Sequence, residues 1–154
     1  MNANLFRILA NFWPPLFFAG IKATRVTKDY RQFDVTLKLR WYNRNYVGVH
    51  FGGSLYSMTD PWYMLILLNN LGKNYFVWDK GAEIEYIAPG RTHVHAHFEI
   101  TEEQLKDIRD KTANGQKYLP IFTVDIRDNN NELIARVKRT LYVKQKPRAR
   151  NAND

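Results

Sequence analysis

Hydrophobic and polar residues alternate through several parts of the chain, and this period of two predicts antiparallel strands. The predicted strands are two within residues 21–41, then 75–88, 91–100, 117–128 and 132–145. The second strand of the first pair has a clear apolar face, formed by Phe33, Val35, Leu37, Leu39 and Trp41. Pro89-Gly90 joins the third and fourth strands, and Asp128-Asn129-Asn130-Asn131 predicts the turn of a hairpin. The pattern therefore predicts about six strands.

The segment from Ser54 to Gly72, SLYSMTDPWYMLILLNNLG, is too long for one strand and predicts a long helix that ends at Gly72. Asp60 is the only charged residue between Asn45 and Gly72. Because a helix that is apolar around its circumference must be covered on nearly every side, we expect it at the centre of the protein. The predicted fold class is α+β, with a curled antiparallel sheet wrapped around this long central helix.

Two further helices are expected at the periphery. Residues 3–13 predict an amphipathic helix that stops at Pro14-Pro15. A second helix follows Thr101, which is a good N-cap, and ends before Gly115. With no Gly/Ser-rich linker in the sequence, residues 1–145 predict a single domain, and residues 146–154 predict a basic, flexible tail.

The amino-acid composition allows a globular core and excludes any chemistry that needs cysteine. Hydrophobic residues make up 45% of the chain, enough for a substantial core, and the absence of cysteine excludes disulfides, thiolate nucleophiles and Cys-ligated zinc. A fold without disulfides suits the cytoplasm, which is the expected location. Arg7 and the two prolines interrupt the apolar N-terminal segment, so stable membrane insertion is not expected, although contact with a membrane interface stays open.

The formal net charge is +8, and residues 136–150 contain seven Lys or Arg and no acid. Such a run attracts phosphates of nucleic acid, coenzyme A, an acidic carrier protein or anionic lipid, or it is simply a solvated strand and tail. No nucleic-acid-binding motif accompanies it, so no nucleic acid is expected as a partner. His93, His95 and His97 share a strand face, but the outer two lie about 13 Å apart and no carboxylate pattern supports them, so no metal site is predicted.

The segment from Val49 to Pro61, VHFGGSLYSMTDP, resembles the central-helix motif of hot-dog thioesterases of the phenylacetate-degradation type. Its FGGSLY segment is also similar to thioesterases grouped with the C-terminal YiiD-like domains, and to an uncharacterised hot-dog family related to both. These proteins have an Asn, a Gly-containing loop, His-Gly-Gly, and an acid seven positions after the second Gly. Here Asn45 lies eight positions before Gly53, and Asp60 lies seven after it. The resemblance implies a hot-dog fold, hydrolysis of an acyl-CoA or acyl-carrier thioester without a cofactor, and a homodimer or dimer of dimers.

The candidate catalytic residues are Asp60, Asn45, Gly52 and Gly53. Backbone amides at a glycine-led helix start can bind a thioester carbonyl, while Asp60 acts as base or nucleophile and Asn45 helps to handle water. The candidate substrate-binding residues are His50, Phe51, Ser54 and Trp62. In a continuous helix Asp60 lies on the face of Gly53 but about 10 Å along the axis, so both groups reach one carbonyl only if two subunits pair.

Two alternatives stay open. Phe51 stands where the resembling thioesterases have His, and the neighbouring His50 points the opposite way in an extended loop, which favours a non-catalytic acyl or acyl-CoA binding protein. Asp60-Pro61 is also typical of an N-cap followed by proline at the first helical position. In that case the helix proper begins at Pro61; otherwise a helix from Gly53 is bent there.

Overall fold

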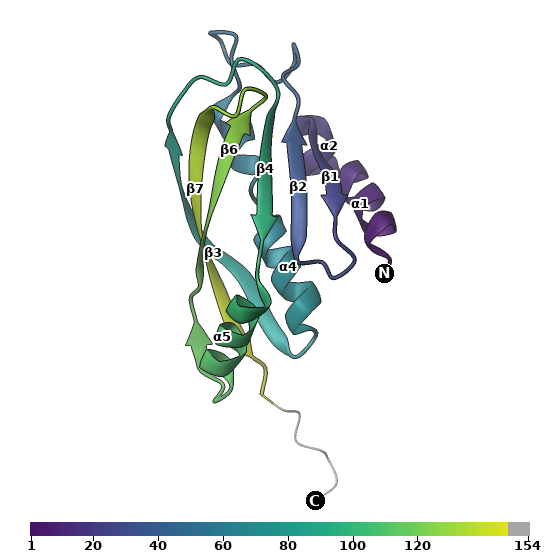
Figure 1. Cartoon of the computed structure of the whole chain (residues 1–154), viewed down its shortest axis with the longest axis vertical. Coiled ribbons are helices and arrows are strands. Elements are labelled where there is room, and N and C mark those ends of the chain that lie inside the picture. Colours follow the sequence, from purple (N-terminus) through teal and green to yellow (C-terminus); the bar gives the residue numbers. More distant parts are fainter. Residues whose placement is uncertain (148–154) are drawn as a thin grey trace, which may run out of the picture.

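The computed structural model describes residues 1–147, and in them seven strands form one antiparallel sheet in the order β1-β2-β4-β6-β7-β3, with β5 beside β7 (Figure 1). The strands are β1 (Ile21–Val26), β2 (Gln32–Leu37), β3 (Tyr75–Tyr86), β4 (Val94–Glu99), β5 (Lys117–Tyr118), β6 (Ile121–Asp128) and β7 (Leu133–Gln145). The predicted α+β class with a curled antiparallel sheet is confirmed. The seventh strand arises because Pro120, which has no N–H, separates the short β5 from β6.

The hairpins predicted from local turn signals are present, namely β1 with β2 and β6 with β7. Strand β2 is shorter than predicted, because the chain turns away from the sheet after Leu37. The Asn43 side chain holds that turn, accepting from the Arg40 N–H and donating to the Lys38 carbonyl. Trp41 therefore does not join the apolar face of β2, and its surface is 81% exposed.

Strands β3 and β4 are consecutive in sequence but do not pair. Strand β3 pairs with β7 at one end of the sheet order, whereas β4 lies between β2 and β6. Pro89 and Gly90 therefore lie in a connection that crosses from one part of the sheet to another, and not in a hairpin. The other long edge of β3 pairs with no strand among residues 1–147.

The predicted long central helix is instead two helices, α3 (Gly52–Ser57) and α4 (Trp62–Leu71). Pro61 cannot donate a hydrogen bond, and the chain tightens before it, with Thr59 N–H bonding to the Tyr56 carbonyl and Asp60 N–H to the Ser57 carbonyl. The first hydrogen bond of helix α4 then runs from the Leu65 N–H to the Pro61 carbonyl. Both sequence interpretations of Asp60-Pro61 are thus wrong in part, since the chain neither bends as one helix nor uses Asp60 as the N-cap.

The core lies between α4 and the concave face of the sheet. The Trp62 ring lies 5.7 Å from that of Phe33 and 6.3 Å from that of Phe98, between centroids. The Tyr63 ring stacks on Phe122 at 4.8 Å, and its hydroxyl donates to the Thr123 carbonyl. Burial raises the pKa of Tyr63, so this phenol stays protonated. These contacts fix α4 firmly against the sheet.

Three helices lie outside the core: α1 (Ala3–Phe12), α2 (Pro14–Ala19) and α5 (Glu102–Thr112). In Figure 1, α1 and α2 flank β1 at one edge of the sheet, while α5 lies near β5 at the opposite end. The prolines that were expected to end the first helix also begin α2, because proline is well tolerated at a first helical turn. Thr101 caps α5 as predicted. The predicted tail falls from residue 148 onward outside the described residues.

Candidate functional site

The loop that carries the Gly-Gly motif is held by backbone bonds and by one side chain. Asn45 N–H donates to the Val49 carbonyl at 2.8 Å, and its side-chain Oδ1 accepts from the N–H groups of Val47 and Val49, each at 3.1 Å. The His50 N–H donates to the Gly90 carbonyl at 2.9 Å. With Oδ1 occupied, the Asn45 amide has its NH2 group left to donate, and no acceptor for it is present among residues 1–147.

Glycines are needed where α3 begins because aromatic rings approach the backbone closely. The Tyr86 hydroxyl donates to the Gly52 carbonyl at 3.1 Å, and a Cβ at Gly52 would lie 3.0 Å from that hydroxyl. A Cβ at Gly53 would lie 2.4 Å from the Phe51 ring. Within the described chain the N–H groups of Gly52 and Gly53 donate to no acceptor. Two backbone donors are therefore free at the same place.

A cavity of about 480 Å³ opens between this loop and the chain that follows β3. Five of the predicted site residues line it, namely Asn45, His50, Phe51, Gly52 and Gly53. Its apolar walls include Leu55, Ile87 and Pro89. The other predicted residues lie elsewhere: Trp62 is buried in the core, and neither Ser54 nor Asp60 is among the residues around this cavity.

His50 is buried in the cavity wall with only 3% of its surface exposed. Its Nε2 lies 2.8 Å from the Thr92 carbonyl, so Nε2 carries the proton and Nδ1 is an acceptor. Nδ1 is buried and has no partner among residues 1–147. Burial lowers the pKa of His50, which keeps the ring neutral.

This burial predicts a pH dependence of stability. Below the ordinary histidine pKa of 6.5 the unfolded chain takes up a proton at residue 50 that the folded protein does not, so folding loses stability as the pH falls through that range. Replacing His50 with Gln removes the difference, and Gln can still donate to Thr92. We expect the stability advantage of the wild type over His50→Gln to shrink between pH 7.5 and 5.5, by at most about 1.4 kcal/mol per pH unit.

Urea denaturation of both proteins at the two pH values measures this change. The matched control is His95→Gln, since His95 is exposed on β4. A difference between wild type and His50→Gln that is the same at both pH values would contradict a buried, neutral His50.

Asp60 is not the buried carboxylate that the apolar sequence around it predicts. Its side chain is 56% exposed, because the break between α3 and α4 turns it outward. The buried charge is instead Arg139, an inward-facing residue of β7 with 2% of its side chain exposed. Arg139 Nη1 donates to Asp60 Oδ2 at 3.2 Å and so fixes the position of the carboxylate.

Arg139 has further partners. Nη1 also donates to Asp79 Oδ1 at 3.3 Å, and Nη2 donates to the Thr59 hydroxyl at 3.2 Å and the Tyr56 carbonyl at 3.4 Å. The guanidinium lies over the Tyr56 ring, 5.1 Å from its centroid. Burial raises the pKa of Asp79, although Arg139 opposes that shift. Arg139 therefore connects β3, β7 and the break between α3 and α4.

Sequence reasoning missed Arg139 because it lies within the basic run of residues 136–150. The alternation of β7 does contain the signal, since Arg139 is two residues after Val137 and two before Leu141, both buried. The run is not one basic surface. Arg136 makes two hydrogen bonds to Asp125, and Lys146 lies over the Phe76 ring.

Replacing Arg139 with Met is expected to lower the free energy of unfolding by about 2 to 3 kcal/mol, because Asp79 loses its partner and the Thr59 hydroxyl and Tyr56 carbonyl each lose one hydrogen bond. The loss stays below that of a fully buried ion pair because both carboxylates are partly exposed. The control Arg136→Met removes an exposed arginine of the same strand and is expected to cost less than about 1 kcal/mol. Equal losses in urea denaturation would show that Arg139 does not hold the helix break.

Two of the three His side chains in and before β4 have protein partners. His97 pairs with Asp34, and His93 Nδ1 accepts from the Leu39 N–H. Among residues 1–147 no group of three His, Cys, Asp or Glu side chains is placed to hold a metal ion.

Comparisons with known proteins agree on the architecture. A family model described as "Domain of unknown function (DUF4442)" matches residues 2–143. A probable thioesterase of unknown function from Pseudomonas aeruginosa is 12% identical, with a TM-score of 0.86 over 94% of this chain and 97% of its own. A thioesterase from Haemophilus influenzae is 15% identical, with a TM-score of 0.69 over 94% and 92%. A protein of unknown function from Chlorobaculum tepidum is 17% identical, with a TM-score of 0.73 over 94% and 93%.

No curated protein matches the sequence. At these identities the solved structures establish the fold, and the expected hot-dog fold is confirmed.

Proposed function

The chain belongs to the DUF4442 family, and we propose that it hydrolyses an acyl-CoA or acyl-carrier thioester. The observation that carries the proposal is the pair of amides without a described acceptor at Gly52 and Gly53, two residues that line a cavity with apolar walls. Backbone donors fixed in this way suit the oxygen of a thioester carbonyl, on which negative charge develops during attack. The likeness in fold to proteins that are themselves named thioesterases supports the same chemistry.

The other polar groups of the cavity have complementary roles. The Asn45 NH2 group is oriented by the two bonds to Oδ1 and donates to the carbonyl or to a bound water. His50 Nδ1 offers a buried acceptor that no described protein group uses. Phe51, Leu55 and Ile87 supply apolar surface for a fatty-acyl or aromatic acyl group. Ser54 and Trp62 stay predicted substrate contacts, and neither lines this cavity within one subunit.

Asp60 supplies the base or nucleophile, and we propose that it acts on the cavity of a second subunit. Within one subunit it does not line the cavity. The cavity and Asp60 are each connected to a residue of β3. Tyr86, at one end of the strand, donates to the Gly52 carbonyl, and Asp79 accepts from Arg139, which also binds Asp60. These two β3 residues are seven positions apart, about 23 Å in a strand.

The free edge of β3 offers the pairing that brings the two features together. Two copies of β3 aligned antiparallel about a two-fold axis between Ala82 and Glu83 would put Asp79 of one copy opposite Tyr86 of the other. Phe76 and Trp78 are partly exposed on this strand, and the second copy would cover them. A homodimer, alone or within a dimer of dimers, is therefore part of the proposed mechanism.

The test is release of free thiol from a panel of acyl-CoA and acyl-carrier thioesters, in wild type and in Asp60→Ala. Hydrolysis by wild type above the uncatalysed rate, lost in the variant, is expected. Equal background rates in both proteins would refute the catalytic proposal.

One observation favours a second function, the binding of acyl thioesters without turnover. Phe51 is 54% exposed and occupies the position of the His in the resembling enzymes, so that position cannot act as an acid or base. This function predicts an increase in the thermal midpoint with acyl-CoA and no thiol release. An unchanged midpoint with every acyl ligand would exclude it.

A further inference from the structure

Helix α1 presents most of its large apolar side chains to the solvent, while Ala3 and Phe6 pack against the core. Its inner side is fixed to the sheet edge by Asn11, whose side chain accepts from the Ala23 N–H at 2.8 Å and donates to the Ala23 carbonyl at 3.0 Å. On the outer side Leu5, Ile8, Leu9 and Phe12 are between 46% and 69% exposed. An ordinary surface helix buries its apolar face, so this orientation marks an interaction surface.

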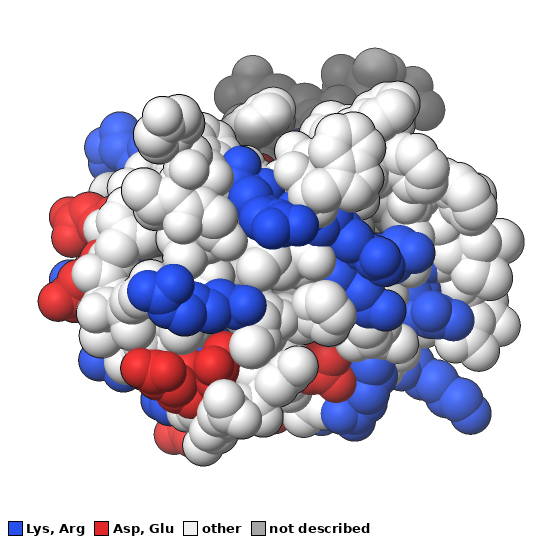
Figure 2. Space-filling view, turned by 90° about the horizontal axis from the view of Figure 1, so that it is seen from above, with Lys and Arg blue, Asp and Glu red and all other residues white. Residues whose placement is uncertain are grey.

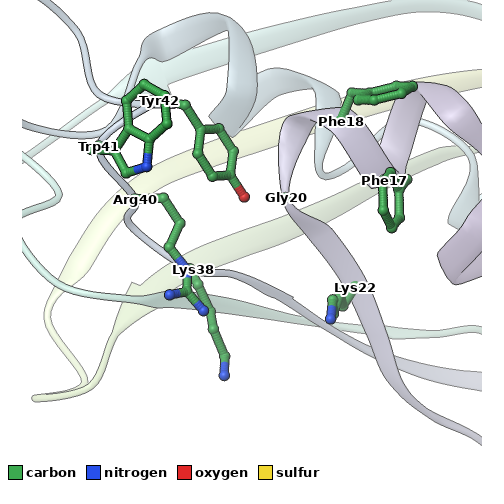
Figure 3. Close-up of a pocket in the computed structure, with 8 residues that line it drawn as sticks. All are labelled: Phe17, Phe18, Gly20, Lys22, Lys38, Arg40, Trp41 and Tyr42. Atoms are coloured by element: carbon green, nitrogen blue, oxygen red, sulfur yellow. The ribbon is translucent and has the colours of Figure 1, made fainter.

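The exposed apolar surface continues onto α2 and the turn after β2. Phe17 and Phe18 lie across a hollow of about 560 Å³ from Trp41 and Tyr42 (Figure 3). Phe18 is 75% exposed and Trp41 81%. We call the outer side of α1, α2 and residues 38–42, together with Lys22 of β1, the aromatic–basic face.

Three cations of this face have no hydrogen-bond or ion-pair partner among residues 1–147. Lys22, Lys38 and Arg40 line the hollow, and in Figure 3 their charged ends lie on the same side of the aromatic rings. No carboxylate lines the hollow, and none within residues 1–147 lies within 4.0 Å of these three groups. Figure 2 shows the molecule from above, where Lys and Arg side chains gather in a band at the centre and right, and Asp and Glu lie at the left and below.

We propose that the aromatic–basic face binds the surface of an anionic lipid bilayer, and this inference does not depend on the proposed hydrolysis. Trp and Tyr favour the headgroup level, Phe and Leu enter the acyl boundary, and Lys and Arg pair with lipid phosphates. A second copy is a poor occupant, because two such faces would bring cations against cations. No helix among the described residues is long and apolar enough to cross a membrane, so the helices lie flat on the bilayer.

The experiment is co-sedimentation of the whole protein with vesicles of phosphatidylcholine alone or mixed equally with phosphatidylglycerol. We expect binding to the mixed vesicles, weakened by salt, and a blue shift of tryptophan emission because Trp13 and Trp41 lie on or beside the face. Lys38→Glu with Arg40→Glu is expected to weaken binding at least tenfold. Phe12→Ser with Phe18→Ser is expected to weaken it about tenfold.

The matched charge control is Lys117→Glu with Lys144→Glu, on β5 and β7 near the opposite end of the sheet, and it should bind like wild type. All these positions are exposed or partly exposed, and unchanged thermal midpoints verify that the variants fold. Failure of the wild type to bind mixed vesicles would overturn the proposal, as would binding that the face variants do not weaken. Release from the vesicles by coenzyme A would assign the cations to a soluble phosphate ligand instead. Self-association lost in Phe12→Ser with Phe18→Ser would assign the face to a second copy.

Discussion

Replacement of Asp60 by Asn is expected to lower kcat/KM for thioester hydrolysis by about 10² to 10⁴-fold, the usual contribution of a positioned acid or base. The change keeps the shape of the side chain but removes the carboxylate that, in the proposed mechanism, attacks the thioester or activates a water. Stability is expected to change by less than about 1 kcal/mol, because the Asp60 side chain is 56% exposed and Arg139 keeps Asp79 as its partner. Thiol release measures the rate, and urea denaturation shows that the loss is not one of folding.

Mixed subunits distinguish action across the dimer from action within one subunit. Gly53→Val places a side chain against the Phe51 ring and across the free amides, so it is expected to be inactive by itself. If Asp60 serves the cavity of its partner, a dimer of one Asp60→Asn and one Gly53→Val subunit has one intact site. A random equal mixture should then recover about a quarter of the wild-type rate.

Formation of mixed dimers without any recovery would show that Asp60 and Gly53 act in the same subunit. Wild-type rates in Asp60→Asn would remove Asp60 from the mechanism altogether.

Trp62→Ala is expected to lower the free energy of unfolding by about 3 to 5 kcal/mol, the largest effect on stability among the substitutions considered. Trp62 is fully buried between Phe33 and Phe98, and its Nε1–H donates to the Met58 carbonyl at 2.8 Å. The truncation leaves both a cavity and an unpaired carbonyl at the end of α3. Urea denaturation measures the loss.

The matched control is Trp41→Ala, which truncates a tryptophan that is 81% exposed and is expected to change stability by less than about 0.5 kcal/mol. Equal losses in the two variants would contradict the central place of Trp62. Trp62→Phe keeps most of the packing and tests the predicted contact with substrate. A changed preference for acyl chain length in that variant would support the contact, and an unchanged preference would leave Trp62 a purely structural residue.

Much of the fold could be predicted from short stretches of sequence. The alternation of Phe33, Val35 and Leu37 predicted the inner face of β2, and Thr101 predicted the start of α5. The Gly-Gly motif marked the start of a helix correctly. Each signal depends on residues a few positions apart, whose hydrogen bonds and side-chain directions follow from local backbone geometry.

The same local logic failed around Asp60. Its apolar neighbours indicated burial, and Pro61 indicated either a cap or a bend, because the segment alone does not contain the group that stabilises the broken helix. That group is Arg139, which is 79 residues from Asp60 and 60 from Asp79 in the chain. Its place in a run of cations made it look like solvated surface.

The α+β class, most strand-forming and helix-forming segments, and a glycine-led helix start near Asn45 and His50 follow from short stretches of the amino-acid sequence. Long-range packing in the folded protein is what separates β3 from β4, pairs the outward-facing Asp60 with a buried arginine, and leaves most large apolar side chains of α1 in solvent. Local sequence patterns indicate which side chains are apolar and with what period they recur. Which face is covered, and which charge finds a partner, depends on distant segments that the folded sheet brings into contact.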